Sequence, residues 1–192
     1  MLREPSQFAR QQRPPEPWRS FLQALDELLE ETVQLHCIGG FVVTMHFGLS
    51  RATSDIDILP GAIPGVTLAR LQTLAGQGSD LHRRFRVYLQ PVGVAGYPDD
   101  YESRLTRMWP TFDLRHLHLY ALEAHDLALT KIERNSDVDR QDVLDLAGAG
   151  HLDPATLRER YAAARPNLIG TARKHDLTLD LWIEMCWPPP RS

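Results

Sequence analysis

Residues 38–59 read IGGFVVTMHFGLSRATSDIDIL, and this stretch decides which fold the chain adopts. A short apolar run at 35–38 meets a Gly-Gly pair, which predicts a buried strand that ends in a turn. The mostly apolar residues 41–47 then predict a short helix. In residues 53–59, apolar and polar side chains alternate with the period of a strand. We therefore expect a strand, a glycine turn, a helix and a second strand in that order.

The chemistry of this stretch lies in its two glycines and two aspartates. Gly39 and Gly40 have no Cβ, so their backbone amides can approach a ligand closely, and amides at the start of a helix favour a phosphate. Asp55 and Asp57 lie two residues apart on a strand, which places both carboxylates on one face, about 6.5 Å apart. Two such donors can hold Mg²⁺ together with substrate phosphates. A glycine turn alone is usually only a turn, and a lone DxD is usually a solvated face, but the combination predicts a metal–nucleotide site.

The remaining chain alternates strand and helix signals and then becomes helical, which predicts an α+β fold. Besides the elements above, we expect helices at 18–29, 64–74, 123–148 and 154–187, strands at 84–90 and 117–122, and a long loop with a short helix at 91–111. The last of these helices should begin at Asp153-Pro154, an N-cap acid followed by proline.

Three parts are expected along the chain. Residues 1–16 are polar and contain several prolines, which predicts a flexible N-terminal arm; residues 17–122 should form the core, and residues 123–187 a helical part packed on it.

Composition excludes several function classes. The 192 residues include 19 Arg, 2 Lys and 25 acidic residues, for a net charge of −4, which argues against a surface coated with positive charge for non-specific nucleic-acid binding. No apolar run is long enough to span a membrane, and we expect no secretory signal, because the first residues contain no hydrophobic run. Two distant cysteines do not form a disulfide framework, so we expect a cytoplasmic protein.

Residues 35–59 resemble the nucleotidyltransferase superfamily, whose fold is shared with DNA polymerase β and the minimal nucleotidyltransferases. Its signature is a strand, a GG or GS turn, a short helix, and a strand with DxD. The finer text is similar to a bacterial branch that includes AbiEii-type abortive-infection toxins: after the glycines come His46, Gly48, Arg51-x-Thr53 and Asp55-Ile56-Asp57. That branch also carries a helical lysine followed by D-x-x-D. Here residues 127–146 read LALTKIERNSDVDRQDVLDL and supply Lys131, Asp142 and Asp145.

The resemblance implies a nucleotidyltransferase fold, with a small mixed sheet flanked by helices and further helices at the C-terminus. It implies that Asp55 and Asp57 bind Mg²⁺, with Mn²⁺ as an alternative. The residues implied to bind the nucleoside triphosphate are Gly39, Gly40, Arg51 and Thr53. It further implies that Lys131 places a charge near the triphosphate or leaving group. Asp142 and Asp145, one helical turn apart, would orient Lys131, the acceptor hydroxyl or the base.

The implied activity is transfer of a nucleoside monophosphate to a hydroxyl of RNA or protein, by the toxin of a toxin–antitoxin pair with a cognate antitoxin. One feature departs from the family. Many members supply a third carboxylate from the strand after DxD, where this chain reads FRVYLQP and offers Tyr88 and Gln90. Either the third ligand comes from elsewhere, or Asp142 or Asp145 substitutes, or catalysis is weak or absent.

Two alternatives remain open. Without the third carboxylate, the chain could be a non-catalytic nucleotide-binding or protein-interaction module, such as an antitoxin or regulator. In a different class, His116-x-His118 could bind a structural metal.

Overall fold

The computed structural model describes residues 13–93 and 96–189. These residues form two compact units, which we call the sheet unit and the helical unit. Within the described chain, the sheet unit comprises residues 13–93 and 105–122, and the helical unit comprises residues 96–104 and 123–189.

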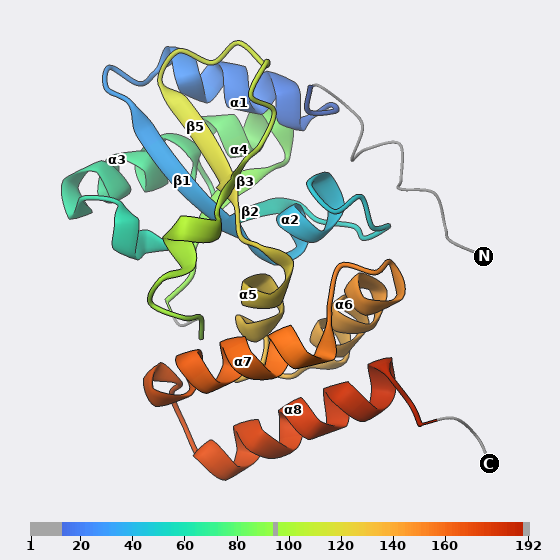
Figure 1. Cartoon of the computed structure of the whole chain (residues 1–192). Coiled ribbons are helices and arrows are strands. Elements are labelled where there is room, and N and C mark those ends of the chain that lie inside the picture. The colour runs from blue at the N-terminus through green and yellow to red at the C-terminus, as the bar shows by residue number, and fades with distance from the viewer. Residues whose placement is uncertain (1–12, 94–95, 190–192) are drawn as a thin grey trace. The chain divides into compact units, whose positions relative to one another are not determined.

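The α+β fold class expected from the sequence is confirmed, since helices and strands mix before residue 122 and only helices follow (Figure 1). Of the arm expected at residues 1–16, residues 1–12 lie outside the described residues. Across the described ranges, no helix has both the length and the apolar character needed to cross a membrane.

The sheet unit contains five strands and four α-helices among its described residues. Its elements are α1 (Trp18–Glu27), β1 (Val33–Ile38), α2 (Gly39–Met45), β2 (Asp55–Ile58), η1 (Pro60–Ala62), α3 (Gly65–Ala75), α4 (Asp80–Phe85), β3 (Tyr88–Pro91), β4 (Thr106–Arg107) and β5 (Leu117–Ala121). The strands form one sheet in the order β3-β2-β1-β5-β4. β1 pairs antiparallel with β2 and parallel with β5, while β3 runs parallel to β2 and β4 antiparallel to β5. The sheet is therefore mixed, as expected.

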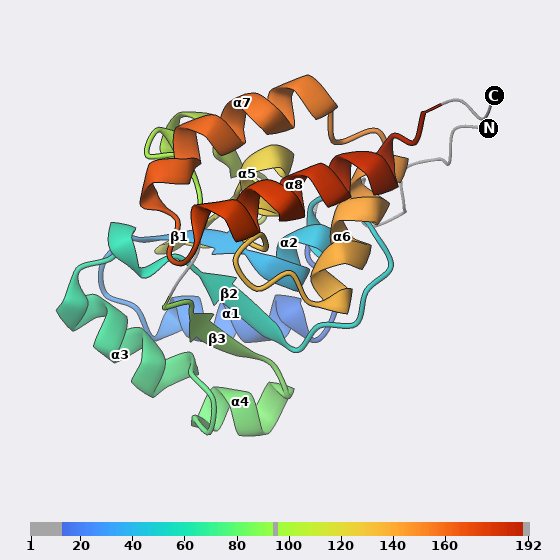
Figure 2. The same cartoon turned by 90° about the horizontal axis from the view of Figure 1, so that it is seen from below.

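One face of this sheet is apolar and the other is polar. The register places the buried side chains of Leu35, Ile56 and Leu119 on the apolar face, and α1, α3 and α4 lie together on one side of the sheet (Figures 1 and 2). Because side chains alternate along a strand, the intervening residues point to the other face. That polar face carries Gln34, His36, Asp55, Asp57, Tyr88, Gln90, His118 and Tyr120.

The strand expected at 84–90 is wrong for its first half. Residues 80–85 form α4, whose N-cap Ser79 accepts a hydrogen bond from the backbone N–H of His82 at 3.1 Å. The helix ends at Arg86, which adopts a left-handed conformation with φ of 63°. Only Tyr88–Pro91 then pairs with β2. Residues 84–90 do alternate, but the helix capped by Ser79 starts before them and includes residues 84 and 85.

Asp26, near the end of α1, connects this helix to the start of β5 through hydrogen bonds. Its side chain is 9% exposed, and its carboxylate accepts three backbone N–H hydrogen bonds, from Arg115 (2.9 Å), His116 (2.8 Å) and Leu117 (2.7 Å). A charged acceptor for three amides is a strong tertiary contact, because hydrogen bonds to ionised groups exceed neutral ones.

We therefore expect Asp26→Asn to lower the free energy of unfolding by about 2–3 kcal/mol, because the amide loses the charge and turns an N–H donor toward one of the three backbone donors. Urea unfolding followed by circular dichroism measures this. Glu27→Gln, the exposed neighbour on the same helix, is the matched control and should change stability by about 0.5 kcal/mol or less. Equal stability of the two variants would contradict the assignment.

The helical unit is built from short and medium helices. Its elements are η2 (Tyr101–Arg104), α5 (Ala124–Leu129), α6 (Asp137–Gly148), α7 (Pro154–Ala164), η3 (Arg165–Asn167) and α8 (Ala172–Cys186). The cap expected at Asp153 is confirmed, since its carboxylate accepts the backbone N–H of Thr156 at 2.8 Å. The continuous helix expected over 123–148 is wrong: it is interrupted at residues 130–136, where Asn135 has a positive φ of 46° and Ser136 caps α6.

Candidate active site

The two aspartates of the DxD motif lie side by side on one strand. Asp55 and Asp57 are both on β2, half-buried, while Ile56 and Ile58 between and after them are fully buried. The Thr53 hydroxyl donates a hydrogen bond to Asp55 Oδ1 at 3.0 Å. Both carboxylates therefore point to the polar face, and one is oriented by a neighbouring hydroxyl.

Gly39, the first residue of the glycine turn, lies directly against Asp57. Gly39 is the first residue of α2, directly after β1, and its φ of 68° is a left-handed conformation that favours glycine. A Cβ at this position would collide with the carboxylate of Asp57. Two features therefore favour glycine at position 39: its left-handed backbone conformation and the close approach of the Asp57 carboxylate.

The second glycine makes room for an arginine. A Cβ on Gly40 would lie 2.6 Å from the guanidinium carbon of Arg51, so the guanidinium group packs directly on the Gly40 backbone. The loop that carries Arg51 is tied to α2, because the Thr44 hydroxyl donates to the Arg51 carbonyl at 3.0 Å. The turn thus has a carboxylate over one glycine and a planar cation over the next.

Replacing Gly39 with alanine should therefore lower the free energy of unfolding by about 1–3 kcal/mol, because alanine strains the left-handed backbone and displaces Asp57. Thermal unfolding measures the change. Gly65→Ala is the matched control: Gly65 is the first residue of α3, with open space around its Cβ position, and this variant should be neutral or slightly stabilising. A neutral Gly39→Ala would disprove the close contact.

Strand β3 supplies the neighbours of the aspartates on the outer side. Tyr88 pairs with Asp55, and Gln90 pairs with Asp57. Burial raises the pKa of the Tyr88 hydroxyl, and the negative charges of Asp55 and Asp57 raise it further. The phenol therefore stays protonated at neutral pH, and it lies close enough to both carboxylates to interact with them electrostatically.

The donor set at this place fits a hard divalent cation. Two carboxylates on one face supply oxygen ligands, and Mg²⁺ commonly uses one or two carboxylates and completes its shell with phosphate oxygens and water. Within residues 13–93 and 96–189, no three His, Cys, Asp or Glu side chains are grouped to share a metal ion. The same finding leaves the His116 and His118 pair without a third ligand in the described chain.

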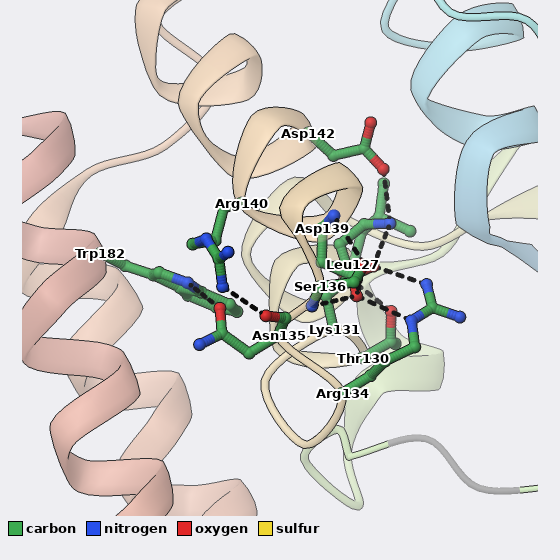
Figure 3. Close-up of polar contacts among 10 residues, drawn as sticks. All are labelled: Leu127, Thr130, Lys131, Arg134, Asn135, Ser136, Asp139, Arg140, Asp142 and Trp182. Carbon is green, nitrogen blue, oxygen red and sulfur yellow. Dashed lines mark hydrogen bonds and ion pairs between the residues drawn. The ribbon is translucent and has the colours of Figure 1, made fainter.

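The predicted lysine lies in a buried ion pair at the junction of α5 and α6 (Figure 3). Lys131 is 2% exposed, and its Nζ donates to Asp142 Oδ2 at 2.8 Å. Asp142 is 3% exposed, so both members of the pair are removed from water. The structure thus brings these two predicted residues together.

Two features of this cluster differ from expectation. Asp145 does not join Lys131; its carboxylate accepts a hydrogen bond from Gln141 at 2.9 Å. The second acid at Lys131 is Asp139, whose Oδ1 lies 3.8 Å from Nζ, and the sequence analysis missed it. The sequence does contain a pattern that singles out Asp139, because Ser136-x-x-Asp139 has the spacing of a capping box. The structure shows that box.

Asp139 is held strongly in its charged form. Burial raises the pKa of its carboxyl, but hydrogen bonds from Arg134 and Ser136 outweigh burial and hold the pKa well below its usual range. Arg134 binds it through two nitrogens, with Nε 2.7 Å from Oδ2 (Figure 3). The α5–α6 junction is therefore a network of two carboxylates and two cations.

The predicted site residues fall into two groups. In the sheet unit, the contacts above unite Gly39, Gly40, Arg51, Thr53, Asp55 and Asp57. In the helical unit, Lys131 and Asp142 form a pair, and Asp145 lies one turn further along α6.

The mixed sheet, the glycine turn and the DxD strand define a nucleotidyltransferase-like protein. The chain belongs to the family described as "Nucleotidyltransferase of unknown function (DUF6036)", whose model matches residues 20–180. This match confirms the superfamily expected from the sequence, and the AbiEii-type branch stays a prediction. No curated protein and no solved structure matches the chain.

Proposed function

We propose that the chain is a Mg²⁺-dependent nucleotidyltransferase that transfers a nucleoside monophosphate from a nucleoside triphosphate to a hydroxyl of RNA or protein and releases pyrophosphate. One observation carries this proposal: the glycine turn has the Asp57 carboxylate against Gly39 and the Arg51 guanidinium against Gly40. An acidic side chain suited to a metal ion and a cation suited to phosphate thus lie against two glycines whose missing Cβ atoms leave room for them.

Each residue of the sheet unit has a role in this proposal. Asp55 and Asp57 hold the cation, which when bound neutralises the phosphate charge that builds up during transfer. Arg51 presents a planar fork that matches phosphate oxygens, and the glycines let the phosphates approach the backbone. Thr53 keeps the Asp55 carboxylate in one orientation through its hydroxyl.

The proposed roles of Lys131, Asp142 and Asp145 form a separate part of the hypothesis, because these residues belong to the helical unit. We propose that Lys131 supplies an ammonium charge to the triphosphate or leaving group and that Asp142 positions it. The 2.8 Å pair between the two side chains supports the positioning role. Asp145 is proposed to orient the acceptor or the base.

A transfer assay tests the activity. The purified chain is incubated with each of the four α-labelled nucleoside triphosphates, Mg²⁺, and total RNA or protein extract. Label should appear in RNA or protein with at least one nucleotide and disappear with a chelator, and pyrophosphate should accumulate. Absence of label with every nucleotide and both extracts would contradict the proposed activity.

We further propose a toxin role in the cytoplasm, with a cognate antitoxin as partner. The support is the similarity of the text from Gly39 to Asp57 to the AbiEii-type branch. Expression in a bacterial host should then arrest growth, and Asp57→Asn should not. Equal growth arrest by both forms would show that any toxicity is unrelated to nucleotide transfer.

A second candidate is a nucleotide-binding module without catalysis, and the neutral residues of β3 favour it, since Tyr88 and Gln90 stand beside the two aspartates where an acid is common in the superfamily. Mg²⁺-dependent triphosphate binding without label transfer in the same assay would select this candidate.

A further inference from the structure

The surroundings of the two aspartates on the sheet contain no additional negative charge in the adjacent register positions. On the β3 side, Gln90 pairs with Asp57 and Tyr88 pairs with Asp55. On the β1 side, Asp57 pairs with Ile38, which is apolar and 3% exposed. Paired residues on neighbouring strands point to the same face, so these side chains are the lateral neighbours of the carboxylates.

The neighbours on β3 cannot replace a carboxylate. Gln90 offers a neutral amide, and Tyr88 offers a phenol. The Thr53 hydroxyl donates a hydrogen bond to Asp55 Oδ1 and so occupies one of the lone pairs with which this carboxylate could bind a metal. The local charge of the ligand set is therefore that of two carboxylates.

The charge balance limits how many cations this set can hold. Two carboxylates neutralise one divalent ion. The triphosphate supplies its own oxygens to this first ion. A second ion, about 3.5–4 Å from the first as in two-metal sites, would share the same two carboxylates and would need a further anionic ligand from the protein to offset the repulsion between the ions. In this register that ligand would come from the position of Gln90, which faces Asp57 from the exposed edge strand β3.

We propose, as a refinement that rests on the proposed function, that the DxD pair binds one divalent cation per bound nucleoside triphosphate and that Gln90 is the residue that limits the number to one. A carboxylate in place of Gln90 completes a second metal position. The acceptor hydroxyl is then activated in the natural chain without a metal of its own.

Counting bound Mn²⁺ tests this inference without any measurement of activity. The chain is equilibrated by dialysis with Mn²⁺ and a non-hydrolysable analogue of each nucleoside triphosphate in turn, with a protein-free chamber to correct for metal bound to free nucleotide. Metal analysis gives the number of ions per chain, and electron paramagnetic resonance distinguishes isolated Mn²⁺ from close, magnetically coupled pairs.

The variants are Gln90→Glu and, as a shorter alternative, Gln90→Asp. The matched control is Gln34→Glu, because Gln34 is also exposed on the polar face but lies at the opposite end of β1 from Ile38. We expect one isolated Mn²⁺ in the natural chain and in Gln34→Glu, and two coupled ions in a Gln90 variant.

Two ions in the natural chain would overturn this inference and leave the proposed function intact. One ion in both folded Gln90 variants would overturn the assignment to Gln90. No bound ion with any analogue would overturn the proposed function and this refinement with it. Circular dichroism confirms that the variants are folded, and the exposed edge position of Gln90 makes folding the expected result.

Discussion

Nucleotide transfer by Asp57→Asn is expected to be at least about 10³-fold slower than transfer by the natural chain, because the substitution removes one of the two anionic ligands proposed for the cation that neutralises the reacting phosphates. The same loss is expected for Asp55→Asn. Both side chains are half-buried, and asparagine has nearly the same size and shape as aspartate, so the fold should persist. Label transfer at saturating nucleotide measures the effect.

The matched control for this substitution is Asp113→Asn. Asp113 is exposed and lies in the loop before β5. In the sheet, β1 lies between β5 and the DxD strand β2. This control should keep its full transfer rate. Retention of more than about a tenth of the activity by Asp57→Asn would place the metal site elsewhere.

Replacing Lys131 with methionine is expected to lower the free energy of unfolding by about 3–5 kcal/mol. Methionine keeps the aliphatic volume but leaves the Asp142 carboxylate, 3% exposed, without its ammonium partner. A buried charge without a partner is more costly than a buried pair. Urea unfolding measures the loss.

Two further variants complete this experiment. Lys174→Met is the control, because Lys174 is the other lysine in the chain and is exposed on α8; its effect should be within about 1 kcal/mol. The double variant Lys131→Met/Asp142→Leu removes both charges and should regain most of the stability. Equal losses for Lys131→Met and Lys174→Met would refute a buried ion pair.

The double variant also separates the two roles proposed for Lys131. If the lysine acts only in folding, a stable double variant transfers nucleotide at the natural rate. The proposed catalytic role predicts instead that the double variant folds and remains inactive.

The sheet part of the site could be predicted because its signals are local. The glycine turn, the short helix and the alternation of Asp55, Ile56 and Asp57 each depend on residues close in sequence, and all three elements appear where expected. The contact of Asp57 with Gly39 is different, since it joins residues 18 positions apart and depends on the pairing of β1 with β2. The motif predicted their proximity, but not that the aspartate covers the glycine itself.

The single helix expected over 154–187 is wrong, because η3 and residues 168–171 separate α7 from α8. The two other errors share a physical cause, which is competition from helix caps. The period-two pattern at 84–90 predicts a strand, but Ser79 and Arg86 delimit a helix over its beginning. The helical pattern from residue 123 predicts a continuous helix, but Ser136 and Asp139 form a capping box that starts a new helix. Asp139 was overlooked for the same reason: its importance comes from the cap and from tertiary contact with Lys131.

Asp55 and Asp57 are proposed to hold a metal for a triphosphate bound at the glycine turn. Calorimetric titration with non-hydrolysable nucleoside triphosphate analogues, with and without Mg²⁺, tests it most directly because it needs no acceptor. At least one analogue should bind the natural chain only with Mg²⁺, and Asp57→Asn should lose this binding while Asp113→Asn keeps it. Binding that is equal with and without Mg²⁺, or unchanged in Asp57→Asn, would contradict it.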